Sequence, residues 1–332
     1  MKDIKVCKFF PFYLFIKFFF LLVIINNIYH LNNILFIHKK YPFNYKLKKI
    51  TKKLNTKIYF DYIDNCAKLK LVKKRKIKKR KHPFLSVCIC VYNSEKYIEK
   101  AILSAINQSF QDFEIIIIND YSNDNSFNII EKIKKIDKRI KSINHKKNQG
   151  IYNSRIEGIL NSKGQYVFFL DSDDLILNPY LFEILFNYYN FFYLDIIEFI
   201  VYYQREDNKK IFYPKKNYLN HNHSFSDNIL YQPQLSNILF YEPRTKKYSR
   251  IICRTIWSKI YKKDLLLKVV NYIGKDYYNK NIIFAEDTSL NIISFHFANN
   301  YTNINLPGYL YNIRKYSITR SKKFAIKRSI KY

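Results

Sequence analysis

Three aspartates, Asp171, Asp173 and Asp174, lie within four residues, directly after a short apolar run that is typical of a buried strand. Carboxylates packed this closely repel one another, and a bound divalent cation would relieve that repulsion. Asp and Ser also favour a helix-capping turn, which here would precede Asn178 and Pro179. The residue types therefore leave two interpretations open, a metal site and a capping turn.

Polar residues follow two other apolar runs in the same way. The run at residues 85–92 leads into Tyr92 and Asn93, and the run at residues 114–118 leads towards Asp120. Neither a GxGxxG fingerprint nor a GxxxxGK(S/T) loop follows the first run, which argues against a dinucleotide site and a P-loop. Any phosphate would have to be bound without a glycine-rich cradle.

The segments between these polar residues alternate between strand and helix patterns. Nearly continuous apolar runs at residues 85–92, 114–118 and 166–170 predict buried strands, and residues 140–144 predict a further strand. Apolar residues at helical spacing separate these segments. A βαβαβαβ order predicts an α/β fold with a doubly wound, mainly parallel sheet. Ligands bind beyond the carboxyl ends of such strands, so we expect the polar residues to converge there.

The charge of the chain is concentrated near its amino end. The sequence has 332 residues with 58 Lys and Arg against 26 Asp and Glu, and residues 1–81 hold 22 basic and 3 acidic residues. Ten of the fourteen residues from Lys68 to Lys81 are basic, which predicts a solvated linker or a segment on an anionic membrane. Hydrophobic residues make up 48%, which excludes a disordered polyelectrolyte.

An apolar segment precedes this basic run. Residues 9–25 carry a single charge, Lys17, and would reach about 25 Å as a helix. No small-residue cleavage site follows, so we expect an uncleaved membrane anchor with a single N-terminal span, the alternative being a buried or interfacial leader. Basic residues flank both ends, which leaves a Golgi or ER lumen and the cytoplasmic face equally open.

Several ordered motifs between Ser86 and Pro179 resemble the donor-binding half of family 2 glycosyltransferases, which are inverting enzymes with the GT-A fold. The strong motifs are Val91-Tyr-Asn93, Asn107-Gln-Ser-Phe110, residues 119–126, Asn148-Gln-Gly150, residues 154–158 and residues 169–174. Weaker matches are residues 257–261, Glu286-Asp287 and residues 311–319. The resemblance thus covers roughly residues 85–320.

The resemblance implies a nucleotide-sugar donor and a divalent metal, Mn²⁺ or Mg²⁺. The implied donor-binding residues are Val91, Tyr92, Asn93, Asp120, Arg155 and Asp171. Asp120 would accept a hydrogen bond from the base or ribose, Arg155 would lie near the base or diphosphate, and Asp173 would hold the metal. The plainer alternatives are an Asx turn at Asp120, a core aromatic at Tyr92 and a surface arginine at position 155.

The resemblance also implies a general base in the acidic pair Glu286-Asp287, and we expect Asp287 to take the acceptor proton. Because a helical pattern follows, Asp287 also fits a helix-capping role. Three positions depart from the family pattern: Cys90 replaces a proline, Asn119 an aspartate and Tyr121 a glycine. A tyrosine where glycine is usual predicts an altered or strained backbone.

Five predicted parts follow from these observations. They are a hydrophobic segment (1–40), a basic linker (41–82), the nucleotide-sugar-binding half of a GT-A domain (83–194), its acceptor-side half (195–320) and a basic tail (321–332). The implied function is metal-assisted, inverting sugar transfer to a hydroxyl of a glycan, lipid or protein. The alternative is a non-catalytic basic α/β protein that binds anionic membrane or nucleic acid, although no specific nucleic-acid partner is expected.

Overall fold

The computed structural model describes residues 81–207, 211–212, 229–232, 241–242, 247–248, 255–274 and 286–314. Every described residue belongs to one compact unit, which falls within Thr56–Tyr332. The predicted hydrophobic segment, nearly all of the basic linker and the basic tail lie outside the described residues.

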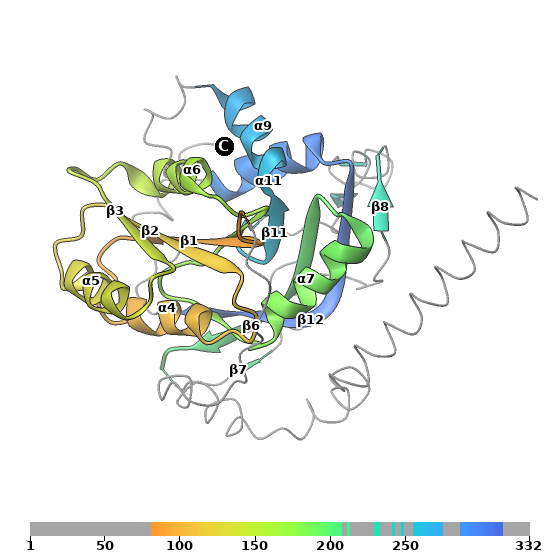
Figure 1. The fold of residues 1–332 in the computed structure, drawn as a ribbon. Helices are drawn as coiled ribbons and strands as arrows, with labels where there is room; N and C mark the ends of the chain where they lie inside the picture. Colours follow the sequence, from red (N-terminus) through yellow and green to blue (C-terminus); the bar gives the residue numbers. More distant parts are fainter. Residues whose placement is uncertain are drawn as a thin grey trace, which may run out of the picture. The chain divides into compact units, whose positions relative to one another are not determined.

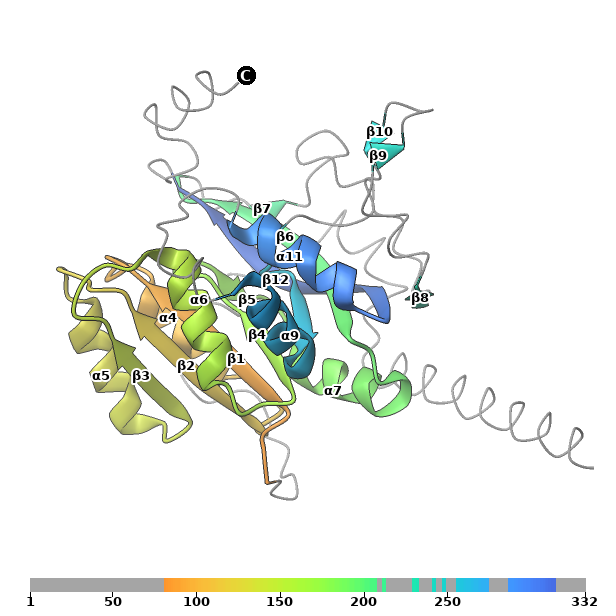
Figure 2. The ribbon, with the colours of Figure 1, turned by 90° about the horizontal axis from the view of Figure 1, so that it is seen from above.

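The first half of the described domain alternates strands and helices, as the sequence predicts (Figure 1). In chain order these elements are β1 (Leu85–Val91), α4 (Ile98–Ile106), β2 (Phe113–Asn119), α5 (Ser126–Ile136), β3 (Ile140–Asn144), α6 (Gly150–Asn161) and β4 (Tyr166–Phe169). The four strands pair in parallel in the order β3-β2-β1-β4. Seen from two directions, α4 and α5 cover one face of the sheet and α6 covers the other (Figures 1 and 2).

Burial on both faces explains why β1, β2 and β4 read as nearly continuous apolar runs, whereas the edge strand β3 is only partly buried. Every residue of β2 is buried, including four consecutive isoleucines. On α5, Ile130 and Ile133 are buried while the lysines of the last turn, Lys134 and Lys135, are not. One helix stripe and one sheet face thus supply the core, which is the arrangement that the helical spacing predicts.

The second half extends the same sheet with strands of both directions. Its main elements are β5 (Leu175–Ile176), α7 (Leu181–Phe192), β6 (Ile196–Arg205), β11 (Lys259–Lys262), α9 (Lys263–Ile273), α11 (Glu286–Phe297) and β12 (Asn300–Ile313). The sheet continues from β4 in the order β11-β6-β12-β5. β11 is antiparallel to both β4 and β6, whereas β12 runs parallel to β6. The sheet is therefore mixed and rich in parallel pairs.

Four short strands complete the described structure. They are β7 (Ile211–Phe212), β8 (Ile229–Tyr231), β9 (Tyr241–Glu242) and β10 (Lys247–Tyr248). β7 pairs with β6, β8 pairs with β12, and β9 and β10 pair with each other. They lie in the region between residues 208 and 250, which the sequence marks as a long polar and aromatic connection.

The predicted membrane location requires correction. Within the part of the chain that the structure describes, no helix is long and apolar enough to cross a bilayer. Its longest helices have 12 residues, a length of about 18 Å against a hydrocarbon core of about 30 Å. The segment on which the prediction rested, residues 1–40, lies outside the described ranges.

A buried carboxylate on β2 joins several strands and yields a first prediction. Glu114 accepts hydrogen bonds from the Ser86 hydroxyl at 2.7 Å, the Lys163 backbone N–H at 2.5 Å and the Lys141 ammonium at 2.6 Å. Burial by itself would raise the pKa of Glu114, but these bonds outweigh it and lower the pKa below its usual range. Glu114→Gln is expected to cost about 1–3 kcal/mol of folding free energy at neutral pH, measured by urea unfolding.

The sign of the pH dependence follows from the lowered pKa. The ionised Glu114 stabilises the fold above the ordinary glutamate pKa, and this contribution is lost as the pH falls through the folded-state value. The difference between wild type and Glu114→Gln should therefore shrink in acid. Glu99→Gln on the exposed side of α4 is the control and should change little at any pH. If the difference in unfolding free energy between wild type and Glu114→Gln stayed the same in acid, the ionised Glu114 would not be what stabilises the fold.

Candidate active site

The loops at the carboxyl ends of β1, β2 and β4 are joined to one another. The Asp120 N–H donates to the Val91 carbonyl at 2.8 Å, which links the ends of β1 and β2. The hydroxyls of Ser94 and Ser172 lie 2.7 Å apart, which links the loop after β1 to the acidic turn after β4. Polar residues that are far apart in sequence thus share one edge of the sheet, as expected for a doubly wound fold.

Arg155 of α6 lies at the centre of a cluster of carboxylates. Its Nη2 is 3.1 Å from Asp171 Oδ1, and its Nη1 is 3.4 Å from Glu286 Oε1 and donates to Asp287. The Arg155 side chain is 2% exposed, so it is not the surface arginine of the plainer interpretation. Burial opposes its charge, but the nearby negative charges, Asp171 foremost, outweigh burial and raise the pKa of Arg155. The structure therefore unites the end of β4, the helix α6 and the start of α11.

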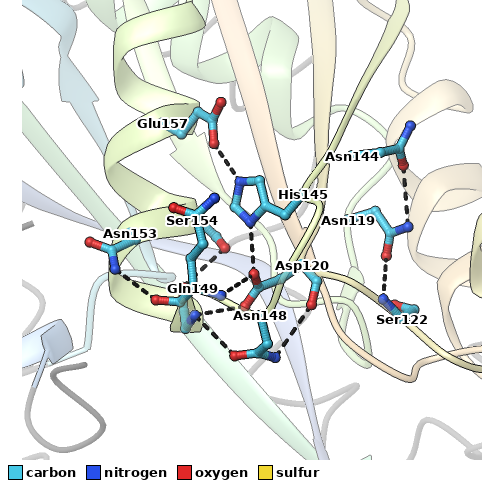
Figure 3. A network of polar contacts seen from close by, with 11 residues as sticks. Asn119, Asp120, Ser122, Asn144, His145, Asn148, Gln149, Asn153, Ser154 and Glu157 are labelled. Carbon is cyan, nitrogen blue, oxygen red and sulfur yellow. Dashed lines mark hydrogen bonds and ion pairs between the residues drawn. The ribbon is translucent and has the colours of Figure 1, made fainter. Parts of the chain in front are cut away.

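Asp120 is buried and has its carboxylate engaged (Figure 3). Its Oδ1 accepts the Gln149 N–H at 2.7 Å and its Oδ2 accepts the Gly150 N–H at 2.8 Å, so the carboxylate caps the amino end of α6. Oδ1 also lies 2.7 Å from His145 Nδ1. These contacts give Asp120 a structural role at the start of α6, and its contact with the base or ribose of a donor stays a prediction.

The remaining residues at the end of β1 differ in what they expose. The Val91 side chain is buried in the core, so only its backbone faces the loops. Tyr92 is 49% exposed, which excludes the core-aromatic alternative. Asn93 has a φ of 48°, and its Oδ1 accepts the Asn123 N–H at 2.9 Å. Tyr121 has a φ of 63°, so this position keeps the left-handed backbone that usually calls for glycine.

The acidic turn separates into residues with different surroundings. Asp174 is fully engaged, because it accepts the Tyr309 hydroxyl at 2.8 Å and the Asn312 N–H at 2.7 Å. Asp173 Oδ2 forms an ion pair with Arg314 Nε at 2.6 Å. Burial raises the pKa of Asp173 to about 6, with Arg314 opposing the rise and the charge of Asp171 adding to it. The turn thus carries a negative charge that Arg314 balances only in part.

This charge distribution decides how a metal could fit. Among the residues that the structure describes, no group of three or more His, Cys, Asp or Glu side chains is placed to hold a metal ion. Asp173 and the nearby Asp171 repel each other, and a divalent cation would relieve that repulsion. These two carboxylates fit a cation whose other ligands come from a bound diphosphate, and Asp174 does not belong to that set.

Three residues of this region lie outside the strong motifs, namely His145, Tyr309 and Arg314, the last of which belongs to a weak motif. Glu157 lies within the motif at residues 154–158, but the motif assigns it no role. His145 directly follows β3, at the same edge of the sheet as Asp120. Its place after a predicted strand could have indicated that it lies near the site. Tyr309 and Arg314 reach the acidic turn because β12 pairs with β5 and β6, and nothing in the local sequence indicates that pairing.

Comparison with known proteins agrees with this geometry. The model of the family described as Glycosyl transferase family 2 matches residues 86–267. A cholesterol galactosyltransferase from Borreliella burgdorferi is 32% identical over 220 residues, which cover 65% of this chain and 58% of that protein. The uncharacterised glycosyltransferase EpsJ from Bacillus subtilis is 28% identical over 237 residues, covering 71% of this chain and 63% of EpsJ.

Solved structures support the fold assignment. S. aureus TarS, in a structure with UDP-GlcNAc, superposes with a TM-score of 0.52 at 22% identity, covering 72% of this chain and 61% of that one. At this identity the likeness shows the fold, a mixed and parallel-rich α/β fold like that of GT-A glycosyltransferases. The chain spans less than two thirds of the length of these relatives. Because the family model matches more than half of the sequence, the chain belongs to glycosyl transferase family 2.

Proposed function

We propose that this protein is a glycosyltransferase that moves a sugar from a nucleoside-diphosphate sugar to an acceptor hydroxyl with inversion. The observation that carries the proposal is the cluster in which Arg155 joins Asp171, after β4, to Asp287, at the start of α11. Family membership supports it, as do the solved structures of TarS in complex with UDP and with UDP-GlcNAc. The acceptor, whether glycan, lipid or protein, is outside the proposal.

Asp287 is the proposed general base, with Glu286 beside it. A carboxylate at the start of α11 can accept the proton of a hydroxyl that attacks the anomeric carbon from the side opposite to the diphosphate. Arg155 would hold Asp287 and Asp171 at a fixed separation, because its guanidinium contacts both. In this view Arg155 positions the reacting groups, and its predicted direct contact with the donor is not needed.

The donor is proposed to bind along the ends of β1 and β4. The exposed Tyr92 ring and the Asn93 loop would flank the nucleotide, together with the backbone of Val91. Asp173 and Asp171 would hold Mn²⁺ or Mg²⁺ with the diphosphate, and the ion would stabilise the negative charge that develops on the leaving group. Residues 83–194 would then form the donor half of the domain and residues 195–320 the acceptor half.

Replacement of Asp173 tests the donor site. Ligand binding to the folded state adds about 2.7 kcal/mol to the free energy of unfolding at a ligand concentration of about 100 Kd. This added stability raises the melting temperature. We expect UDP or UDP-GlcNAc to raise the melting temperature of the full chain, and Mn²⁺ to enlarge this rise. In Asp173→Asn the Mn²⁺-dependent part should vanish. The measurement is a thermal melt with each nucleotide, with and without Mn²⁺.

Asp264→Asn is the matched control, because Asp264 is an exposed aspartate in the first turn of α9. It should retain the full Mn²⁺ effect. If Asp173→Asn also retained it, the metal assignment would be wrong. If no nucleotide sugar shifted the wild-type protein, the proposed function would fail, and salt-sensitive binding to anionic vesicles would then favour the non-catalytic alternative.

A further inference from the structure

His145 has a carboxylate on each of its two ring nitrogens. Its Nδ1 lies 2.7 Å from Asp120 Oδ1, and its Nε2 lies 2.5 Å from Glu157 Oε2 (Figure 3). A neutral imidazole has one N–H and one lone pair, so one of these contacts would set a lone pair against a carboxylate. With both carboxylates ionised, only the imidazolium can donate to both oxygens. The geometry therefore favours a charged ring, although the His145 side chain is only 3% exposed.

Through the two carboxylates the ring is linked to α6 at positions before and after Arg155 in the sequence. Asp120 accepts the backbone N–H groups of Gln149 and Gly150, at the amino end of the helix. Glu157 lies two residues beyond Arg155, within the same helix. His145 itself directly follows β3. The ring thus connects the sheet to the first turns of α6, from which Arg155 reaches Asp171 and Asp287.

The charged groups around the ring come from three segments. Asp120 faces it from the loop after β2, and Glu157 faces it from α6. On its own segment, Lys146 and Lys147 follow and are exposed. Burial disfavours the charged ring, but the hydrogen bonds and negative charges of Asp120 and Glu157 outweigh burial and raise the pKa of His145. A raised pKa means that the ring keeps its proton to a higher pH than a free imidazole does, and loses it as the pH rises further.

We propose that His145 is a positioning residue that acts as a buried imidazolium, fixing Asp120 and α6, and with them Arg155, in the arrangement that binds the donor. Loss of the ring proton would break one of its two hydrogen bonds and leave a lone pair facing a carboxylate. The donor site would then loosen as the pH rises through the pKa of this ring. The effect on donor binding rests on the proposed function, whereas the protonation of the ring does not.

Two measurements on the full chain test this inference. With ¹⁵N-labelled histidine, NMR should show both ring nitrogens of His145 protonated at pH 7, the signal being assigned by its loss in His145→Gln. UDP affinity in the presence of Mn²⁺, measured by calorimetry across pH, should fall by about tenfold as this ring titrates, which corresponds to about 1.4 kcal/mol. A residue with only a packing role would show no such link between ring titration and affinity.

Glu157→Gln carries the test, because Glu157 is partly exposed and its loss should leave the fold intact. Without the Glu157 charge, both the ring titration and the fall in UDP affinity should move together to lower pH. Glu99→Gln, which removes an exposed charge from α4, is the control and should move neither.

A ring with a single N–H at pH 7, or a titration unchanged by Glu157→Gln, would overturn the imidazolium. Titration without a parallel change in UDP affinity would overturn the positioning role. If UDP did not bind wild type at any pH, the proposed function and the positioning role would both fail. The NMR titration would still decide the ionisation of the ring, so the two failures are distinguishable.

Discussion

Asp287→Asn is expected to lower the rate of sugar transfer by about 10²–10⁴-fold while leaving UDP affinity nearly unchanged, because proton abstraction by a positioned base contributes about that factor. Asparagine has almost the same shape as aspartate but cannot accept the acceptor proton. Asp287 lies on α11, whereas the proposed nucleotide contacts lie at the ends of β1 and β4. The assay is release of UDP from UDP-GlcNAc or UDP-galactose by the full chain, with UDP affinity measured in parallel.

Glu286→Gln is the matched control for Asp287→Asn. Both residues lie in the first turn of α11 and both contact Arg155, so each substitution removes one charge from the same cluster. If Asp287 is the base, its replacement should slow transfer far more than that of Glu286. Equal effects would indicate that the two carboxylates share an electrostatic role. A larger effect at Glu286 would indicate that Glu286 is the general base. Loss of UDP affinity in Asp287→Asn would indicate that the cluster binds the donor rather than activating the acceptor.

The first four strands of the fold are predictable because their signals are local. β1, β2 and β4 bury both faces, so they read as apolar runs, and each crossover helix has one apolar stripe. The edge strand β3 is only partly buried. The strand at residues 114–118 and the helical pattern ending at Ile136 agree with β2 and α5 to within a few residues. Parallel pairing then follows from the alternation of elements.

The second half depends on pairings that no local pattern indicates. β11 has four residues, and its insertion between β4 and β6 brings together segments separated by some sixty to ninety residues. β12 passes the acidic turn, where the Tyr309 hydroxyl contacts Asp174. Sequence spacing marks the aspartates as a group. It does not show that Asp174 accepts hydrogen bonds from β12 while Asp173 pairs with Arg314.

The site was predictable in its location and less so in its contacts. Asp120 was assigned to the donor from a motif, whereas its contacts are with the backbone of α6 and with His145. Arg155 was expected near the base or diphosphate, yet it contacts Asp287, 132 residues further along the chain. A motif reports which residue types share a loop, and the direction of each side chain depends on packing across the whole sheet. The assignments of catalytic and donor-binding residues therefore stay predictions until variants are measured.

Arg155 offers the second large effect, on stability as well as on activity. Arg155→Met leaves Asp171, Glu286 and Asp287 facing one another without a cation. Removing one partner of a fully buried ion pair costs about 3–5 kcal/mol. The three carboxylates here are 16–24% exposed, so solvent screens part of their repulsion and we expect about 2–3 kcal/mol by urea unfolding. Transfer should also slow, because Asp287 loses the group that holds it.

Two further variants separate charge from geometry at this position. Arg155→Lys keeps the positive charge, but a single ammonium cannot bridge three carboxylates as a planar guanidinium does. It should therefore recover part of the stability and little of the activity. Arg139→Met is the control for transfer, because Arg139 contacts Asp137, Gln111 and the Phe113 ring, none of which belongs to the site. If Arg155→Met matched wild type in both stability and transfer, the cluster could not be what holds Asp287 beside Asp171, and the proposed mechanism would lose its central contact.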